Sequence, residues 1–170
     1  LGCGRIARCL AVKAQVFGIK VIAYDPYIKP EAVKDFGVTL VSREELLAQS
    51  DFISMHLLLN EDTRKSINAD FFKKMKNSAI FVNTARGGLV DEDALIEALR
   101  TGEIAGAALD VLTEEGIDKD APLQKFDNVI ITPHAAWYSE QAFYTLLTSA
   151  AQEVVRALHG EPVKNQVNHF

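Results

Sequence analysis

Two short segments of the chain hold residue types that bind anions or transfer protons. Arg86 lies in Asn83–Gly88 (NTARGG), directly after an apolar run typical of a buried strand. His134 lies in Thr132–Trp137 (TPHAAW), again directly after such a run. An arginine fork suits a carboxylate or the oxygen pair of a keto acid, and a histidine gives and takes a proton near neutral pH. Local sequence leaves two alternatives open: an ordinary surface arginine beside a Gly-Gly turn, and a structural histidine.

An acidic loop supplies a third candidate, Glu115. It follows the apolar run Ile104–Asp110 and lies in Thr113–Lys125, the one long loop that the sequence predicts. Acids in loops are usually solvated, and nothing in the local sequence distinguishes Glu115 from Glu114.

The elements that must position these side chains follow from hydrophobic patterns. Apolar runs with little polar alternation are typical of strands covered on both faces, and we expect them at Lys20–Tyr24, Gly37–Val41, Asp51–His56, Ala79–Asn83, Ile104–Asp110 and Asn128–Thr132. Helical patterns lie between them, from Ile6 to Phe17, after Ser42–Glu45, from Asp91 to Gly102, and finally over about 139–159. We expect capped helix starts at Ser42 and Asp91. This alternation predicts an α/β fold with a doubly wound parallel sheet.

A glycine-rich turn opens the chain. Gly2–Ala7 (GCGRIA) has the spacing G-x-G-x-x-A, which allows a tight turn, a close approach of a pyrophosphate and packing of the next helix. The start of that helix would offer free N–H groups to phosphates. Asp25 ends the next strand, where an acid can accept hydrogen bonds from both adenosine ribose hydroxyls and repel a 2′-phosphate, so NAD is favoured over NADP. The alternative is a plain tight turn, with Asp25 as a turn former before Pro26.

A strand normally precedes such a turn, and in a doubly wound sheet it is the central one. The given sequence opens at Leu1-Gly2, so we expect a fragment that lacks this first strand and leaves its two neighbours without a shared partner.

Composition excludes several classes of protein. The 170 residues are 48% hydrophobic and 24% charged, as in a soluble globular domain. A net charge of −5 without a long basic run argues against nucleic acid as a partner. No apolar stretch approaches the roughly 20 residues of a membrane helix. Cys3 and Cys9 form neither a disulfide framework nor a metal site, and free thiols fit a cytoplasmic protein.

Several segments together resemble the successive signatures of the D-isomer-specific 2-hydroxyacid dehydrogenases. They are Gly2–Ala7, Asp25–Tyr27 (DPY), Val82–Val90 (VNTARGGLV), Ala107–Glu115 (AALDVLTEE) and Thr132–Trp137. The run His134–Glu140 (HAAWYSE) resembles the branch that contains the C-terminal-binding proteins, which are corepressors with a dehydrogenase fold. The resemblance implies that residues 1–170 form an NAD-binding domain of the Rossmann type, without the separate substrate domain. The final helix and tail would return toward that domain.

The resemblance also implies roles for single residues. Arg86 would bind the substrate carboxylate and carbonyl, and Trp137 would lie beside the substrate. His134 would give a proton to the carbonyl oxygen as a hydride arrives, and Glu115 would orient its ring and favour the imidazolium. The NAD contacts that it implies are Gly2, Gly4, Arg5, Ile6, Asp25, Leu57, Asn60, Thr63, Thr84, Ala85, Asp110, His134 and Ala136.

The implied function is an NAD-dependent enzyme, a cytoplasmic homodimer, that interconverts a small 2-keto acid and a D-2-hydroxy acid. Without its substrate domain the chain alone is not expected to catalyse efficiently. The alternative, which the corepressor resemblance allows, is an NAD(H)-sensing binding protein with little turnover. The sequence does not identify the substrate.

Overall fold

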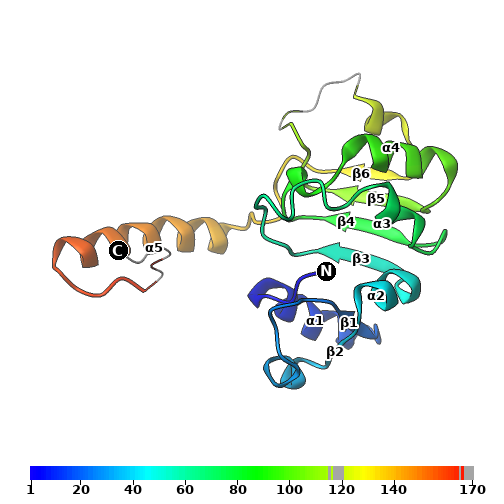
Figure 1. Ribbon diagram of the computed structural model, residues 1–170. Helices are drawn as coiled ribbons and strands as arrows, with labels where there is room; N and C mark the ends of the chain where they lie inside the picture. The colour runs from blue at the N-terminus through cyan, green and yellow to red at the C-terminus, as the bar shows by residue number, and fades with distance from the viewer. Residues whose placement is uncertain (115, 117–120, 165, 167–170) are drawn as a thin grey trace. The chain divides into compact units, whose positions relative to one another are not determined.

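The computed structural model describes residues 1–114, 116, 121–164 and 166. The chain forms two compact units, Leu1–His134 and Ala135–Phe170. Figure 1 shows the elements of both: the first unit holds all the described strands, and the second holds the long helix α5 (Glu140–Leu158).

Parallel strands in two groups form the centre of the first unit (Figure 1). Their bounds are β1 Val21–Ala23, β2 Val38–Leu40, β3 Phe52–Met55, β4 Ile80–Asn83, β5 Gly106–Leu109 and β6 Val129–Ile131. Among the described residues, β1 pairs with β2, and β3, β4, β5 and β6 follow one another in a four-stranded sheet with every pairing parallel. Each expected strand is therefore present, somewhat shorter than its apolar run.

The first residue of the chain lies between the two groups of strands. The Leu1 amino group donates a hydrogen bond to the Ser54 carbonyl (2.7 Å), and the Leu1 carbonyl accepts from the His56 N–H (2.8 Å), so Leu1 extends the sheet beside β3. On the other side, the Gly2 N–H donates to the Tyr24 carbonyl after β1 (2.9 Å). Leu1 and Gly2 thus occupy the end of a strand position between β1 and β3.

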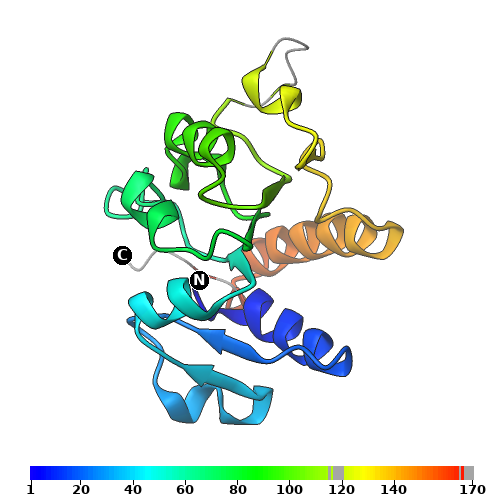
Figure 2. The same ribbon diagram turned by 90° about the vertical axis from the view of Figure 1, so that its right-hand side faces the viewer.

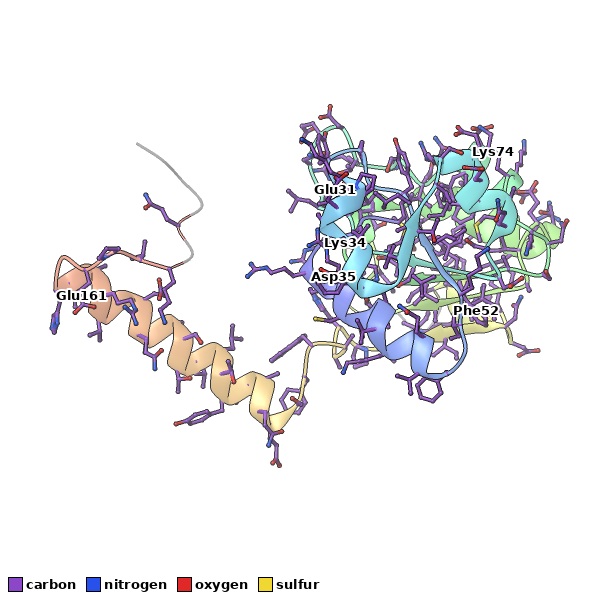
Figure 3. The ribbon with its side chains drawn as sticks, turned by 90° about the horizontal axis from the view of Figure 1, so that it is seen from below. Glu31, Lys34, Asp35, Phe52, Lys74 and Glu161 are labelled. Atoms are coloured by element: carbon purple, nitrogen blue, oxygen red, sulfur yellow. The ribbon has the colours of Figure 1, made fainter. Side chains whose placement is uncertain are left out.

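The rest of that strand position is a cavity of about 280 Å³ between β1 and β3. Val21, Ile53 and Phe52 are among the apolar side chains that line it. Phe52 of β3, labelled in Figure 3, is 63% exposed at the edge of the four-stranded sheet. Among the described residues no strand lies between β1 and β3, so the expectation that these two strands lack a shared partner is confirmed.

The helices of the first unit cover the strands from both sides. They are α1 Arg5–Val16, α2 Arg43–Gln49, α3 Ala69–Lys73 and α4 Glu92–Thr101, with short 3₁₀ helices η1 Pro30–Ala32, η2 Lys34–Phe36, η3 Gly87–Leu89 and η4 Pro122–Lys125. Figure 2 shows α2, α3 and α4 on one side of the strands and α1 on the other, as in a doubly wound fold. No helix in the described part of the chain is long and apolar enough to span a bilayer.

The helix ends agree with the sequence in most respects. Ser42 and Glu45 form the expected capping box, with Ser42 Oγ accepting from the Glu45 N–H (3.1 Å) and Glu45 Oε2 accepting from the Ser42 N–H (3.0 Å). Gly102, at φ 72°, ends α4. Asp91 stands at the N-cap of α4, but its side chain caps no N–H of the described residues. The expected side-chain cap at Asp91 is therefore wrong. The backbone there differs from that of a capping residue, with a ψ of 103° compared with 160° at Ser42.

Three aromatic rings form the centre of the core beneath the four-stranded sheet. Phe71 and Phe72 of α3 pack edge-to-face against Phe81 of β4, with centroids 6.3 and 5.5 Å away. All three side chains are at most 1% exposed. Such contacts add to the burial of apolar area and hold α3 on the sheet.

Replacing Phe81 with alanine should lower the free energy of unfolding by about 3–5 kcal/mol, because a cavity replaces a ring with two edge-to-face partners. Phe81→Leu, which keeps most of the volume, should cost about 1.5 kcal/mol or less. Urea denaturation measures both values. Equal losses for the two variants would contradict this account of the core.

Candidate active site

The turn before α1 requires glycine at its first position. Gly2 has φ 84°, and a Cβ there would lie 2.7 Å from the His56 carbonyl oxygen. At Gly4, by contrast, a Cβ would meet no atom of the described residues within 4 Å. The space above Gly4 is therefore open to the close approach of a ligand, as the motif predicts.

The start of α1 has the properties of an anion site. Gly4 is its N-cap, no side chain of the described residues caps the helix, and its first turn contains no acid. The first N–H groups of a helix lack partners within the helix, and the dipole there favours negative charge. Arg5 and Ile6, two of the expected pyrophosphate contacts, are exposed at this end.

Asp25 ties the glycine turn to the segment after β1. Its Oδ2 accepts from the Cys3 N–H (2.8 Å) and its Oδ1 from the Tyr27 N–H (2.9 Å). Each carboxylate oxygen can accept a further hydrogen bond, so Asp25 can still bind ribose hydroxyls. The Asp25 carboxylate thus holds the turn and can still accept hydrogen bonds from a ligand. Together with the open space at Gly4, this geometry fits a dinucleotide.

The loop after β3 is closed by two of the residues that we expect on the adenosine side. Asn60 Oδ1 accepts from the Thr63 N–H (2.9 Å), and Thr63 Oγ1 accepts from the Asn60 N–H (2.8 Å). Leu57 lies half-buried against the core at the start of the same loop. The structure therefore brings these three residues into one loop beside the glycine turn, and their contact with adenosine stays a prediction.

The histidine at the end of β3 is held neutral by its surroundings. Burial lowers the pKa of His56 to about 4. Its Nε2 lies 3.0 Å from Ser54 Oγ. A neutral, half-buried ring with a hydrogen-bond partner is typical of a structural histidine.

A buried amide shapes the loop that carries Arg86. Asn83 is 0% exposed, its Oδ1 accepts from the Ala85 N–H (3.0 Å), and its Nδ2 donates to the Arg86 carbonyl (3.0 Å). A Cβ on Gly87 would overlap the Leu112 carbonyl, so the loop packs closely on its neighbour. Asn83 is not among the residues expected at the site, although an amide at the last position of an otherwise apolar strand is a signal for such a role.

The guanidinium of Arg86 lies on the surface of this loop. Its Nη1 donates to the Ala85 carbonyl (2.6 Å), and the side chain is otherwise exposed. Thr84, exposed, and Ala85, half-buried, form the turn between Asn83 and Arg86. Their expected place beside the nicotinamide ribose stays a prediction.

Backbone hydrogen bonds join the carboxyl ends of β4, β5 and β6. The Asp110 N–H donates to the Asn83 carbonyl (2.9 Å), and the His134 N–H donates to the Asp110 carbonyl (3.0 Å). Asp110 is 5% exposed, and its carboxylate accepts a hydrogen bond from the Thr132 hydroxyl. The Arg86 loop, Asp110 and His134 therefore follow one another along one sheet edge, as the sequence predicts.

His134 adopts an unusual backbone conformation. Its φ is 52°, in the left-handed region, where a non-glycine residue costs about 1–3 kcal/mol. Such strain persists only where the surrounding structure holds it, and it is common at functional sites.

Three further residues were expected at the site, namely Glu115, Ala136 and Trp137. Glu115 lies outside the described residues, so its pairing with His134 stays a prediction. Ala136 and Trp137 belong to the second unit, where the Trp137 ring packs edge-to-face on Tyr138 with centroids 5.5 Å apart. Their contacts with cofactor and substrate stay predictions too.

A glycine turn at a helix start, an acid after the next strand and a doubly wound parallel sheet define an α/β dinucleotide-binding domain. A family model described as the NAD-binding domain of D-isomer-specific 2-hydroxyacid dehydrogenases matches residues 1–136. The chain belongs to this family.

Relatives in sequence agree with this assignment. The chain is 45% identical over 169 residues to a D-3-phosphoglycerate dehydrogenase of Methanocaldococcus jannaschii, covering 99% of the chain and 32% of the relative. It is 40% identical over 168 residues to a glyoxylate reductase of Korarchaeum cryptofilum, covering 99% and 51%. Assignment to the corepressor branch stays a prediction.

Solved structures agree as well. A D-lactate dehydrogenase with NAD⁺ from Lactobacillus jensenii superposes with a TM-score of 0.89 at 35% identity, covering 99% of this chain and 54% of that one. An NAD-complexed D-isomer-specific 2-hydroxyacid dehydrogenase from Lactobacillus delbrueckii ssp. bulgaricus gives a TM-score of 0.89 at 36% identity, covering 98% and 54%. The chain thus spans between about a third and about half the length of the proteins that it matches.

Asp25→Asn should weaken NADH binding about tenfold or more, because hydrogen bonds to a charged acceptor are worth about 1.5–3 kcal/mol. The ratio of the dissociation constants for NADPH and NADH should decrease at the same time, since the charge that repels a 2′-phosphate is removed. Isothermal titration of the whole protein with each nucleotide measures both effects. Asp35→Asn, an exposed acid on η2, is the matched control. An unchanged NADH affinity in Asp25→Asn would contradict the role given to Asp25.

Proposed function

We propose that the whole protein is an NAD-dependent dehydrogenase that interconverts a small 2-keto acid and the corresponding D-2-hydroxy acid. One observation carries the proposal: the Arg86 loop, Asp110 and His134 follow one another along hydrogen-bonded strand ends. Membership of the family and the names of the relatives support this class of substrate.

The residues that would hold NAD lie along the carboxyl edge of the strands. The pyrophosphate would bind at Gly2, Gly4, Arg5 and Ile6, where the open start of α1 supports an anion site. Asp25 would accept from the adenosine ribose, with Leu57, Asn60 and Thr63 on the adenosine side and with Thr84, Ala85, Asp110, His134 and Ala136 on the nicotinamide side. When bound, the nicotinamide supplies the hydride-transfer chemistry that protein side chains lack.

Arg86 would bind the substrate. Its guanidinium has five N–H donors, and only Nη1 is engaged in a described hydrogen bond, with the Ala85 carbonyl. The remaining donors suit the planar oxygen pair formed by a 2-keto acid's carboxylate and carbonyl. Asn83, which holds the Arg86 carbonyl, keeps the loop in one shape without touching the substrate. Trp137 would lie beside the substrate.

His134 would give a proton to the substrate carbonyl oxygen during reduction and take it back during oxidation. General acid–base catalysis of this kind contributes about 10²–10⁴-fold. Glu115 would orient the imidazole and favour its protonated form. The proposal extends to a substrate domain that closes over this edge, to a homodimer and to a cytoplasmic location, all of them expected from the resemblance.

In the whole protein, His134→Gln should lower kcat by about 10²–10⁴-fold, because glutamine keeps a polar group but cannot exchange the proton. NADH affinity should fall far less than kcat, since His134 is expected on the nicotinamide side only and the phosphate and ribose contacts remain. Oxidation of NADH, followed by absorbance, measures kcat with a panel of 2-keto acids whose side chains range from hydrogen to phosphorylated groups. NADH titration measures the affinity.

His159→Gln, an exposed histidine at the end of α5, is the matched control and should leave kcat unchanged. Full activity in His134→Gln would refute the proton-transfer role. If the wild-type protein binds NADH but oxidises it with no member of the panel, the NAD(H)-sensing alternative replaces the enzyme.

A further inference from the structure

The chain makes a strained turn directly after β6. Pro133 precedes His134, which has a φ of 52°. Among the described non-glycine residues, only Lys65, at 50°, also has a positive φ. The His134 N–H is divided between two acceptors, the Thr132 carbonyl and the Asp110 carbonyl, each 3.0 Å away. Since an L-residue adopts this conformation only where neighbours hold it, these acceptors help to fix the position of His134.

Asp110 is the point where the turn is attached to the rest of the sheet. Its N–H donates to the Asn83 carbonyl of β4 and its carbonyl accepts from His134, so its backbone is fixed on both sides. Its carboxylate is buried and accepts from the Thr132 hydroxyl. A buried carboxylate needs such donors, because it has lost its hydration.

Thr132 closes the contact between β5 and β6 where their ladder ends. Its N–H donates to the Leu109 carbonyl (2.9 Å), the last ladder bond of this strand pair. Its hydroxyl then reaches Asp110, one residue further along the neighbouring strand. Thr132 therefore contacts the end of β5 twice. Its main chain binds Leu109, and its side chain binds the next residue, Asp110, whose carbonyl accepts from His134.

We propose that Thr132 is a positioning residue: its hydroxyl, through the Asp110 carboxylate, holds the left-handed turn that presents His134. Thr132 itself needs no contact with substrate or cofactor. The inference rests on the proposed function in one respect, namely that the positioned imidazole transfers the proton. Neither the family motif nor the expected contacts with NAD assign a role to the Thr132 hydroxyl.

Thr132→Val and Thr132→Ser in the whole protein separate the hydroxyl from the shape of the side chain. Valine keeps the branched shape and removes the donor, so kcat should fall about tenfold, as for the loss of a hydrogen bond to a charged group. NADH affinity should stay within about twofold, and the primary isotope effect with deuterated NADH should increase as the chemical step becomes limiting. Serine restores the donor and should restore kcat. A merely destabilising substitution would not produce this pattern.

Amide hydrogen exchange at His134 tests the positioning without any turnover. The His134 N–H should exchange about tenfold faster or more in Thr132→Val, because the side-chain hydrogen bond that helps to hold Asp110 beside the turn is lost. In Thr132→Ser it should exchange at the wild-type rate. Protection of the β4 amides should not change. Thr132→Ala provides the same readout if valine is not accommodated. Thr101→Val is the control, since that hydroxyl donates to the Glu97 carbonyl within α4.

The two proposals can fail separately. Unchanged exchange at His134 in both Thr132→Val and Thr132→Ala overturns the positioning role, whatever the activity. Equal kcat values for the valine and serine variants of an active enzyme overturn it as well. A protein that turns over no 2-keto acid, yet shows faster exchange at His134 in Thr132→Val, keeps the positioning role and refutes the proposed reaction.

Discussion

The main-chain hydrogen bonds across the ends of β4, β5 and β6 are the constraint on which the candidate site depends. Asn83 accepts from Asp110, and Asp110 accepts from His134, so segments far apart in the sequence end at one edge in a fixed order. Parallel strands all direct their carboxyl ends to the same edge, which is where doubly wound folds bind ligands. The aromatic core around Phe81 holds α3 against β4 and supports this edge from below.

Hydrogen bonds from polar side chains fix the conformation of the loops at this edge. The Asn83 amide fixes the loop of Arg86, and the Asp25 carboxylate fixes the glycine turn through Cys3. The Thr132 hydroxyl meets the Asp110 carboxylate beside the His134 turn. In each case a side chain with few rotatable bonds satisfies backbone or carboxylate groups that would otherwise be costly to bury. The loops of Arg86 and His134 are therefore held by side chains of neighbouring residues.

Much of this arrangement could be predicted from the sequence because the signals are local. Strands covered on both faces are apolar throughout, and Ser42 with Glu45 is a capping box that needs no tertiary partner. The division of the described strands into two groups, one with β1 and β2 and the other with β3 to β6, agrees with the expectation drawn from the glycine turn. The predicted edge placement of Arg86, Asp110 and His134 followed from strand ends in a parallel sheet.

Features that depend on neighbours in space could not be predicted. The role of Asn83 depends on a loop that folds back over it, and that of Thr132 on the adjacent end of β5. The sequence Pro133-His134 does not indicate that His134 adopts a left-handed backbone conformation. The five-residue helix α3 is too short for a periodic pattern, and Asp91 has the residue type of a cap without its geometry.

The central claim is that Arg86, after β4, and His134, after β6, bind one substrate at the same edge of the sheet. A crystal structure of the whole protein with NADH and an unreactive 2-keto acid analogue tests it most directly. The account predicts that the analogue's carboxylate lies about 3 Å from the Arg86 guanidinium and its carbonyl oxygen within the same reach of the His134 imidazole. An analogue bound by one of these side chains while the other faces away from it would contradict the account.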